Sequence, residues 1–437
     1  MRTETVRTEV IAGVTTFVTM AYILFVQPAV LTTDFTGRPT GLDFGAVLLA
    51  TCVVSGAATI AMGLWARYPI ALAPGMGENF FFVSVIMALA AAGVSEPWRA
   101  ALGLVFISGV IFLVLSAAGV REAVLDSISP SLRNAIASGI GFFVAFIGLR
   151  NGTLIVAHPG TLVTLNPNLL SADVAVFTAG LITSAVLHIR GVRGAILMGI
   201  AAAAIVAALA GKIHYAGVFG LPQIATPAAF QFDLATAASP RWLPFVAVFL
   251  FMNVFDTIGS VVGVTQQAGL IRDGKLPRAG RVLVVDAAGT VLGAALGTST
   301  IVTYIESAAG VSAGGRTGLT AVVAGSLFFV ALCFSPLIGM IASYLPITAP
   351  ALIVVGAMMM SNAARIDWDD ASESVPAFLT MIGIPLTYSI ADGLAIGFIS
   401  YPVVKALTGR GRDIGRISYA IAALLIIYFV FVRARLG

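Results

Sequence analysis

The sequence has little charge, few histidines and almost no cysteine. Only 10% of its 437 residues are Asp, Glu, Lys or Arg, and 59% are hydrophobic. Soluble domains carry roughly 25% charged residues, so water cannot be the main solvent of this surface. Cys52 and Cys333 lie in apolar runs without a CxxC or His companion. His158, His188 and His214 lie in expected loops or helix ends. We therefore expect no disulfide framework, no metal site and no cofactor.

The basic residues do not indicate a nucleic-acid partner. The net charge is +4, but the arginines and lysines sit at the ends of apolar runs, which is typical of topology signals in membrane proteins. No basic face remains once these signals are set aside. We expect no nucleic acid and a lipid bilayer as the surrounding medium.

Long apolar runs recur from one end of the chain to the other. Each can cross a hydrocarbon core of about 30 Å only as a helix, because lipid offers no partner for backbone amides. The runs and their breakers predict an all-α polytopic membrane protein with about fourteen spans. The predicted spans are 9–31, 44–66, 69–92, 99–120, 133–150, 173–189, 192–211, 242–264, 281–297, 299–313, 316–334, 349–361, 375–390 and 391–407.

The distribution of basic residues predicts the orientation. With the N-terminus in the cytoplasm, most fall on the inner side, for example Arg190, Arg193 and Arg281, and few fall outside, for example Arg99 and Arg241. The polar Met1–Glu9 leads straight into the first span, so we expect this span to be retained. The expected location is the cytoplasmic, or inner, membrane. The sequence leaves open whether the apolar run 419–432 spans it.

The two halves of the chain resemble each other weakly. VQPAVL (26–31) parallels TQQAGL (265–270), and VVSGAATIAMG (53–63) parallels LVVDAAGTVLG (283–293). An odd number of spans per repeat, about seven here, forces the copies into opposite orientations. We predict a first inverted repeat over 1–211, an extracytoplasmic connection over 212–241, a second repeat over 242–407, and a basic segment with an extra apolar helix over 408–437. Chance similarity among Ala-, Gly- and Val-rich helices is the alternative.

Two predicted spans cannot be continuous helices. Pro69, Pro74 and Gly75 forbid a helix before about Met76, so the third span should be a short strand followed by a half-helix. The tenth span has the β-branched run 300–303 before a helix that we expect to start near Tyr304. Two breaks at corresponding repeat positions are the best pointer in the sequence to a substrate site.

Several polar residues lie at these breaks and on the eighth span. Asn79 and Glu306 lie at the openings of the half-helices, where free amides meet a ligand. In the eighth span Asp256 shares a helix face with Asn253, Thr257 and Ser260. An aspartate at the centre of a membrane helix costs about 2.5 to 3.5 kcal/mol, so Asp256 and Glu306 are predicted site residues.

The remaining polar and aromatic residues of these spans are less distinctive. Glu78 points about 100° away from Asn79 around the helix, and a site role and a structural role both remain open. Asp286 and Asp392 are interpreted as helix-packing or capping groups. Phe80 is the predicted ring contact for a flat ligand. Thr257, Thr303, Ser307 and Asn253 are expected to support the site.

Three stretches give the chain a family resemblance. ALAPGMGENFFF (71–82), FMNVFDTIGSVVGV (251–264) and GTSTIVTYIESAAGVSAGGRTGLTAVV (297–323) resemble the AzgA-like branch of the nucleobase/ascorbate transporter superfamily, the xanthine/uracil permease group. The resemblance runs over nearly the whole chain. It implies fourteen spans in two inverted repeats, a core domain from 9–120 and 242–334, and a gate domain from 133–211 and 349–407. It also implies proton-coupled uptake of adenine, guanine or hypoxanthine, and a homodimer.

Carried over residue by residue, the substrate-binding carboxylates of this family fall on Asp256 and Glu306, and its third-span asparagine falls on Asn79. The chain departs from the branch at two places: Glu78 and Phe80 replace a GMGLNAFF-like pattern, and Asn253 stands where DLFDT is frequent. These changes leave the base and the coupling stoichiometry open.

The resulting hypothesis is secondary transport of a purine nucleobase by alternating access. Two carboxylates and amide-bearing helix ends match the donors and acceptors on a purine edge. Asp256 or Glu306 is expected to take the coupling proton, with Glu78 as a further candidate and another cation as the alternative. The alternatives for the cargo are a uracil or xanthine type of base, or an anion in a sulfate-permease-like carrier, which the carboxylates disfavour. An enzyme would need a nucleophile with its base or a metal cluster, and a channel would need a continuous polar stripe.

Overall fold

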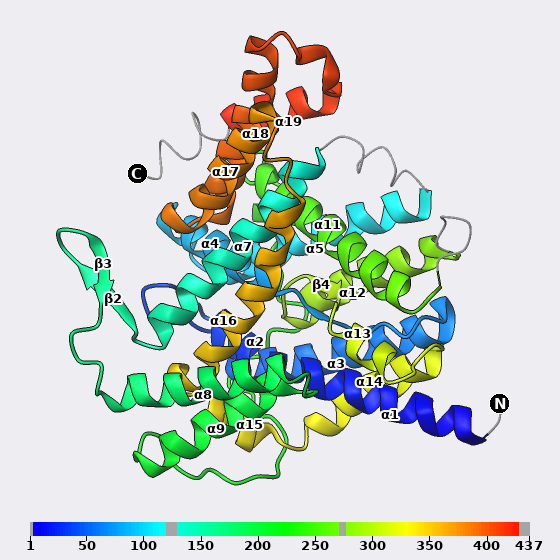
Figure 1. The fold of residues 1–437 in the computed structure, drawn as a ribbon, viewed down its shortest axis with the longest axis vertical. Helices are drawn as coiled ribbons and strands as arrows, with labels where there is room; N and C mark the ends of the chain where they lie inside the picture. The colour runs from blue at the N-terminus through cyan, green and yellow to red at the C-terminus, as the bar shows by residue number, and fades with distance from the viewer. Residues whose placement is uncertain (1–2, 119–128, 271–276, 428–437) are drawn as a thin grey trace.

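The computed structural model describes residues 3–118, 129–270 and 277–427, and most of this chain is helical (Figure 1). The first half contains α1 (Thr3–Met20), α2 (Ile23–Leu31), α3 (Phe44–Ala61), the π-helix η1 (Met62–Ala66), β1 (Leu72–Pro74), α4 (Met76–Ala91), α5 (Pro97–Ala118), α7 (Pro130–Asn151), β2 (Ile155–His158), β3 (Leu162–Leu165), α8 (Ala172–Ile189) and α9 (Ala195–Leu209).

The second half of the chain begins with the short helix that precedes the eighth predicted span. It contains α10 (Leu234–Ala237), α11 (Leu243–Gln267), α12 (Ala279–Leu296), β4 (Ile301–Thr303), α13 (Ser307–Ser312), α14 (Gly318–Ala331), α15 (Ser335–Ala342), α16 (Leu345–Met360), the 3-10 helix η2 (Ser361–Arg365), α17 (Ala371–Leu386), α18 (Ile390–Leu407), the 3-10 helix η3 (Gly411–Asp413) and α19 (Arg416–Ile427).

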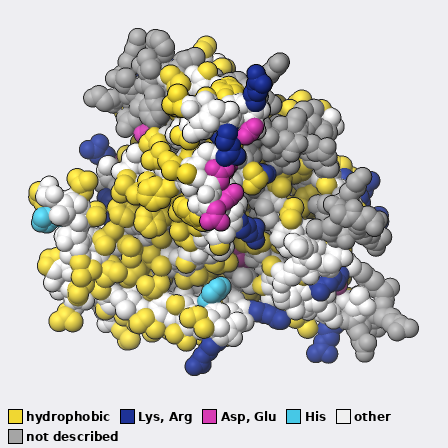
Figure 2. All heavy atoms as spheres, turned by 45° about the horizontal axis from the view of Figure 1, so that its top comes forward, with side chains coloured by type: hydrophobic (Ala, Val, Ile, Leu, Met, Phe, Trp, Pro, Cys, Tyr) yellow, Lys and Arg dark blue, Asp and Glu magenta, His cyan; other side chains and the backbone are white. Residues whose placement is uncertain are grey.

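The helices and the surface are those of a polytopic membrane protein. Within the described residues, 8 helices are long and apolar enough to cross a membrane, and four shorter apolar helices accompany them, α4, α9, α14 and α17. Hydrophobic side chains cover a wide part of the face in Figure 2, while most of the visible acidic side chains lie with some basic ones in a narrow stripe, and further basic side chains lie around the margin. Large apolar side chains such as Ile182, Ile205 and Leu209 point outward and are 58% to 85% exposed. Such a surface suits lipid.

The helices pack in two groups. In one group α14 packs on α1 and α3, and α12 packs on α3 and α5. In the other, α7 packs on α16 and α17, α8 packs on α9 and α16, and α17 packs on α18. The groups touch through α4, which contacts α7 and α18, through α1, which contacts α9, and through α2, which contacts α16. In Figure 1, α1 and α14 lie together at one side, and α17, α18 and α19 lie at one end of the long axis.

Glycines allow the closest helix crossings. A Cβ on Gly318 of α14 would lie 1.9 Å from the carbonyl oxygen of Gly63, which follows α3 in η1. A Cβ on Gly356 of α16 would lie 2.5 Å from the carbonyl oxygen of Gly141 in α7. Both contacts are with backbone, which cannot move aside as a side chain can. Small residues at such crossings are typical of membrane helices, because they let the backbones approach.

The third and tenth spans have the predicted form of a strand followed by a short helix. β1 precedes α4, which begins at Met76 as expected, and β4 precedes α13. The expected start near Tyr304 is wrong, because α13 begins at Ser307. The physical reason is that strand pairing continues past β4: the Tyr304 N–H donates to the Ala71 carbonyl at 2.9 Å, so the backbone at 304 is still engaged with the other strand.

Some elements differ from the sequence prediction. The span 9–31 is divided into α1 and α2 at Ala21 and Tyr22, and the span predicted from 349 begins at Leu345. The hairpin of β2 and β3 projects from the helices in Figure 1 and was not predicted. Cys333, expected to pack in an apolar run, is exposed. α19 lies within the predicted C-terminal apolar run, whose part after 427 lies outside the described residues, as do 119 and 120 of the fourth span.

Candidate functional site

Two short strands from distant parts of the chain cross inside the helical assembly. β1 and β4 pair antiparallel, with Leu72 opposite Thr303 and Pro74 opposite Ile301. The pairing extends at both ends, because the Gly75 N–H donates to the Thr300 carbonyl at 3.0 Å and the Tyr304 N–H donates to the Ala71 carbonyl. The two broken spans therefore meet at one place.

Threonine hydroxyls satisfy the outer edges of these strands. Thr59 of α3 accepts from the Leu72 N–H at 2.8 Å and donates to the Leu72 carbonyl at 3.2 Å. Thr290 of α12 accepts from the Ile301 N–H at 3.2 Å and donates to the Ile301 carbonyl at 2.9 Å. Burying a backbone N–H or carbonyl without a hydrogen bond at membrane depth costs about 2 to 7 kcal/mol of folding free energy. The threonine hydroxyls supply these hydrogen bonds and so avoid that cost. Each strand therefore has one residue whose N–H and carbonyl both bond to a single threonine hydroxyl.

Asp256 and Glu306 come together beside this crossing. Glu306 directly precedes α13, is 8% exposed, and accepts a hydrogen bond from the Tyr22 hydroxyl at 2.6 Å. Asp256 lies on α11, whose neighbouring residues Thr257 and Ser260 hydrogen-bond to Thr303, three residues before Glu306. The sequence analysis did not find Tyr22. The sequence shows only a single tyrosine within the first span. Its contact with Glu306 could not be predicted, because the two residues are 284 positions apart.

Asp256 lies on an exposed part of α11, where Gly259 and Val262 are exposed as well. Ile305, next to Glu306, is 42% exposed, whereas Glu306 itself is 8% exposed. A carboxylate facing lipid would be expensive, so we expect Asp256 to meet water or a polar ligand.

Glu78 and Asp286 lie deeper. Glu78 is 1% exposed and Asp286 is 0% exposed. Glu78, in the first turn of α4, folds back against Gly75 at the end of β1, where a Cβ would lie 2.1 Å from its Oε2 and 3.1 Å from Val302 of β4. Asp286 of α12, which the sequence analysis interpreted as a packing group, accepts from the Thr257 hydroxyl at 2.8 Å through Oδ2. The structure therefore places Glu78, Asp256, Asp286 and Glu306 in one acidic region around the strand crossing.

Asn79 belongs to a closed amide network. Its Nδ2 donates to Gln27 Oε1, and its Oδ1 accepts from the Ser299 hydroxyl. The Gln27 amide in turn donates to Thr298 at 2.9 Å and to Ser299 at 3.0 Å. This network joins α2, α4 and the segment before β4, and Gln27 was not predicted. The proposed contact of Asn79 with a ligand stays a prediction.

The predicted supporting residues connect α11, α12 and the strands. The Asn253 amide donates to Thr290 at 2.8 Å, and Thr303 Oγ1 donates to the Thr257 carbonyl at 3.2 Å. The Ser307 hydroxyl accepts from the Ala71 N–H at 3.0 Å. All four side chains are buried, so they hold the site elements in place. At the start of α18, the Asp392 N–H donates to the hydroxyl oxygen of the capping residue Ser389 at 3.2 Å.

Phe80 packs in an aromatic cluster. Its ring lies 6.3 Å from that of Phe35 and 6.1 Å from that of Phe143. Tyr388, in the turn between α17 and α18, completes the cluster at 5.2 Å from Phe35 and 5.3 Å from Phe143. Arg150 of α7 donates to the Phe35 carbonyl and, at 2.9 Å, to the Tyr388 hydroxyl. The contact of Phe80 with a ligand ring also stays a prediction.

This cluster borders a pocket of about 470 Å³ that Phe80, Phe35 and Arg150 help to line. The pocket lies among the end of α2, the start of α16 and the C-terminal end of α7. By the predicted orientation it is on the extracytoplasmic side. We refer to it below as the outer pocket.

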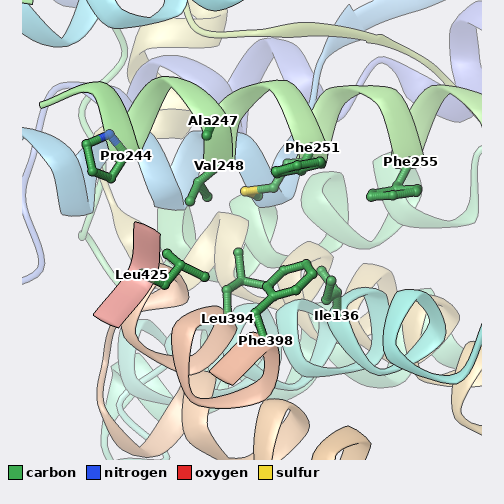
Figure 3. A pocket seen from close by; sticks show the side chains of 10 residues that line it. Ile136, Pro244, Ala247, Val248, Phe251, Phe255, Leu394, Phe398 and Leu425 are labelled. Carbon is green, nitrogen blue, oxygen red and sulfur yellow. The ribbon is translucent and has the colours of Figure 1, made fainter. Parts of the chain in front are cut away.

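A second, smaller pocket is entirely apolar. Figure 3 shows Phe251, Phe255 and Val248 of α11 facing Phe398 and Leu394 of α18, with further contributions from α7 and α19. None of its lining side chains can hydrogen-bond to a ligand edge, so it is an apolar contact between the two groups of helices. Among the described residues, no group of three or more His, Cys, Asp or Glu side chains is arranged to hold a metal ion.

The chain matches known proteins over nearly its whole length. The profile of the Permease family, Xan_ur_permease, matches residues 7–396. The guanine/hypoxanthine permease PbuG of Bacillus subtilis is 44% identical over 434 residues, which are 98% of this chain and 97% of that protein. The adenine permease AdeP of Escherichia coli is 42% identical over 431 residues, which are 98% of this chain and 94% of that protein.

Solved structures with the same fold include anion transporters. The transmembrane domain of a cyanobacterium bicarbonate transporter, BicA, matches with a TM-score of 0.65 at 18% identity, over 91% of this chain and 98% of that chain. SLC26A9 matches with a TM-score of 0.61 at 11% identity, over 91% of this chain and 65% of that chain. At such identities the likeness concerns the fold alone.

Proposed function

The chain belongs to the Permease family of xanthine/uracil permeases, within the nucleobase/ascorbate transporter superfamily, and from this premise we propose that it carries a purine nucleobase across the membrane by proton-coupled alternating access. The proposed substrates are guanine, hypoxanthine and adenine, because relatives named for these bases match nearly the whole chain. The observation that carries the proposal is that Asp256 and Glu306 lie on elements that meet at the crossing of two broken spans.

The proposed site recognises the hydrogen-bonding edge of the base. Purines present ring N–H and amino donors, and a carboxylate accepts through two oxygens. Asp256 is exposed, and Glu306 is held by the hydrogen bond from Tyr22. A base that fails to donate to them would leave buried acceptors unpaired, at about 1 to 3 kcal/mol each. We propose that Phe80 and Asn79 complete the site when the helices rearrange around the base.

The proposed mechanism needs two bodies that move relative to each other. We propose two inverted repeats, 1–211 and 242–407, that contribute to a core domain (9–120 and 242–334) and a gate domain (133–211 and 349–407). The paired strands with matching Thr59 and Thr290 support the repeat, and the packing of the helices in two groups supports the two domains. The wholly apolar contact in Figure 3 suits a surface that slides, because it has no hydrogen bonds to break.

An anion carrier is the rival function, because BicA and SLC26A9 share the fold. The acidic region argues against it. At about 4 Å and an effective dielectric of about 20, two like charges repel by about 4 kcal/mol, so a site edged by Asp256 and Glu306 repels an anion. A uracil or xanthine type of base would fit the same carboxylates, so binding experiments must distinguish these bases from guanine, hypoxanthine and adenine. We further propose the cytoplasmic membrane, an N-terminus in the cytoplasm and a homodimer.

Ligand-induced thermal stabilisation tests this function. The detergent-purified protein should gain Tm with guanine, hypoxanthine or adenine, and not with sulfate or bicarbonate, because only a ligand of the folded state stabilises it. Glu306→Gln and Asp256→Asn should abolish the gain, whereas Glu96→Gln, which removes a surface carboxylate paired with Arg99, should keep it. Stabilisation by an anion, or an undiminished purine response in Glu306→Gln, contradicts the proposal.

A further inference from the structure

The short helix α13 depends on its neighbours for its place. It has 6 residues, Ser307–Ser312, and it directly follows Glu306, so a movement of α13 moves that carboxylate. Isolated helices shorter than about 12 residues are marginal in water, because few hydrogen bonds form for the backbone that is fixed. The contacts that hold α13 therefore decide where Glu306 lies.

α13 lies directly against α1. A Cβ on Gly310 of α13 would lie 2.7 Å from the Ala12 carbonyl oxygen of α1 and 2.0 Å from Thr16 Oγ1. A Cβ on Gly13 of α1 would lie 2.6 Å from the Thr320 carbonyl oxygen of α14. Because these neighbours include backbone, a larger side chain at either glycine would push the helices apart. α1 is thus the surface on which α13 and the start of α14 rest.

Glu9 of α1 holds the turn that leads from α13 into α14. Its Oε1 accepts from the Arg316 N–H at 3.0 Å and from the Thr317 N–H at 3.1 Å, and its Oε2 accepts from the Thr320 hydroxyl. Glu9 is 2% exposed. The N–H groups lie at the N-terminus of α14, where the helix dipole favours a negative charge. On the other side of the turn, the Arg316 guanidinium donates to the Val311 carbonyl near the end of α13.

α13 is therefore held at both of its ends by one segment, α1 with the break that follows it. Glu9 holds the turn after α13, and Tyr22 donates to Glu306 just before α13. Glu9 and Tyr22 are 13 positions apart in the chain, which is roughly 20 Å along a helix, too far for a direct interaction. Any coupling between these two residues must pass through α13 and Glu306.

We infer that Glu9 is a positioning residue of the nucleobase site: by holding the turn after α13, it sets the place of the Glu306 carboxylate. The inference rests on the transport function proposed above, in which Glu306 accepts from the base. In the sequence Glu9 is only the last residue of the polar stretch before the first span. Its role becomes visible where the fold brings it to a turn more than 300 positions away, at Thr317.

A double-mutant cycle on the affinity for hypoxanthine tests the inference. Glu9→Gln should weaken binding by roughly tenfold, the size expected when a hydrogen bond to a charged group is lost. In a Tyr22→Phe background the same change should weaken binding by less than about twofold, because both substitutions act through Glu306. Gly310→Ala, which displaces α13 from α1, should behave as Glu9→Gln does. Isothermal titration of the detergent-purified protein measures all four affinities.

Glu373→Gln is the matched control. Glu373 of α17 is a carboxylate whose side chain is 15% exposed, and it pairs with Lys405 at 2.8 Å in the other group of helices. Its replacement should lower Tm and keep the affinity for hypoxanthine. Wild-type affinity in Glu9→Gln overturns the inference. So do losses that multiply when Glu9→Gln and Tyr22→Phe are combined, because independent effects on the fold add in free energy.

Hydrogen–deuterium exchange measures the position of α13 without any base. The amides of 306–315 should exchange faster in Glu9→Gln than in the wild type, and at the wild-type rate in Glu373→Gln, because exchange reports local opening. Unchanged exchange in Glu9→Gln overturns the inference. Absence of binding of any purine by the wild type refutes the proposed function instead, and exchange then still decides whether Glu9 holds α13.

Discussion

Tyr22 is the residue that most changes the interpretation of the site. It lies at the break between α1 and α2, is 1% exposed, and donates to Glu306. A hydrogen bond to a charged group contributes about 1.5 to 3 kcal/mol. Tyr22 therefore favours the ionised form of Glu306 over the neutral form and fixes the direction in which its other oxygen accepts.

Tyr22→Phe should weaken hypoxanthine binding by roughly tenfold or more, because Glu306 loses its donor and its orientation. Isothermal titration of the purified protein measures this change. Tyr68→Phe is the matched control, since the buried Tyr68 hydroxyl donates to the Pro277 carbonyl outside the acidic region. Equal affinities for the wild type and Tyr22→Phe would show that this hydrogen bond has no part in binding.

At the scale of elements, the turn between α17 and α18 meets the segment after α2 through Arg150. Tyr388 has a φ of 55°, and its ring, the Phe35 carbonyl and the Arg150 guanidinium connect three separate elements. This connection joins the proposed gate to the proposed core beside the outer pocket. Breaking it should favour the form in which the two bodies separate on that side.

Arg150→Gln should raise the reactivity of a cysteine in the outer pocket by roughly fivefold, about 1 kcal/mol in the population of the open form. The probe is Ala29→Cys, a buried lining position, in a Cys333→Ser background, labelled with a membrane-impermeant maleimide from outside. Arg241→Gln is the control, because that guanidinium lies 4.7 Å from the Trp242 ring. Unchanged labelling in Arg150→Gln would show that the hydrogen bonds of Arg150 do not hold the two bodies together on that side.

Asp370 ties α17 to the segment after α18. Its Oδ1 accepts from the Ser372 N–H at 2.9 Å and hydroxyl at 2.7 Å, and its Oδ2 lies 2.7 Å from Arg410 Nη1. The Ser372 hydroxyl, then Arg410, hold the pKa of Asp370 well below its usual range. A lowered folded-state pKa gives stability that is present above the unfolded value of about 3.9 and is lost as the pH falls toward the folded value.

Asp370→Asn should therefore lower Tm at pH 7, and the difference from the wild type should shrink below about pH 4. Asparagine still caps a helix, so the change reports the charge. Asp369→Asn, at the neighbouring exposed position, should leave Tm unchanged. A difference that is constant from pH 7 to pH 3 would contradict the role of the Asp370 charge.

The sequence predicted many elements because lipid restricts what a chain can do. Apolar runs located the long helices, and Pro74 with Gly75 located the strand before α4. The start of α13 was misplaced because pairing with Ala71 is a contact between distant segments. For the same reason the Gln27 network and the Tyr22 hydrogen bond could not be predicted. Asp286 was found within a span but not as part of the acidic region, since its neighbours come from other helices.

For the whole molecule, the fold does not identify the cargo. The fold is shared with a bicarbonate transporter at 18% identity, whereas the chain belongs to the Permease family. Fold alone does not determine the cargo. We propose that the charge at the crossing of β1 and β4 does, because it decides whether an anion or a hydrogen-bond donor is stabilised there.

Transport by the purified protein tests this claim most directly. Uptake of radiolabelled hypoxanthine into proteoliposomes would be driven by an inward proton gradient, with excess unlabelled guanine, adenine, uracil, sulfate or bicarbonate as competitors. We predict accumulation that a protonophore abolishes, competition by purines and not by anions, and loss of uptake in Glu306→Gln at matched abundance. Competition by sulfate or bicarbonate, or wild-type uptake in Glu306→Gln, would contradict the account.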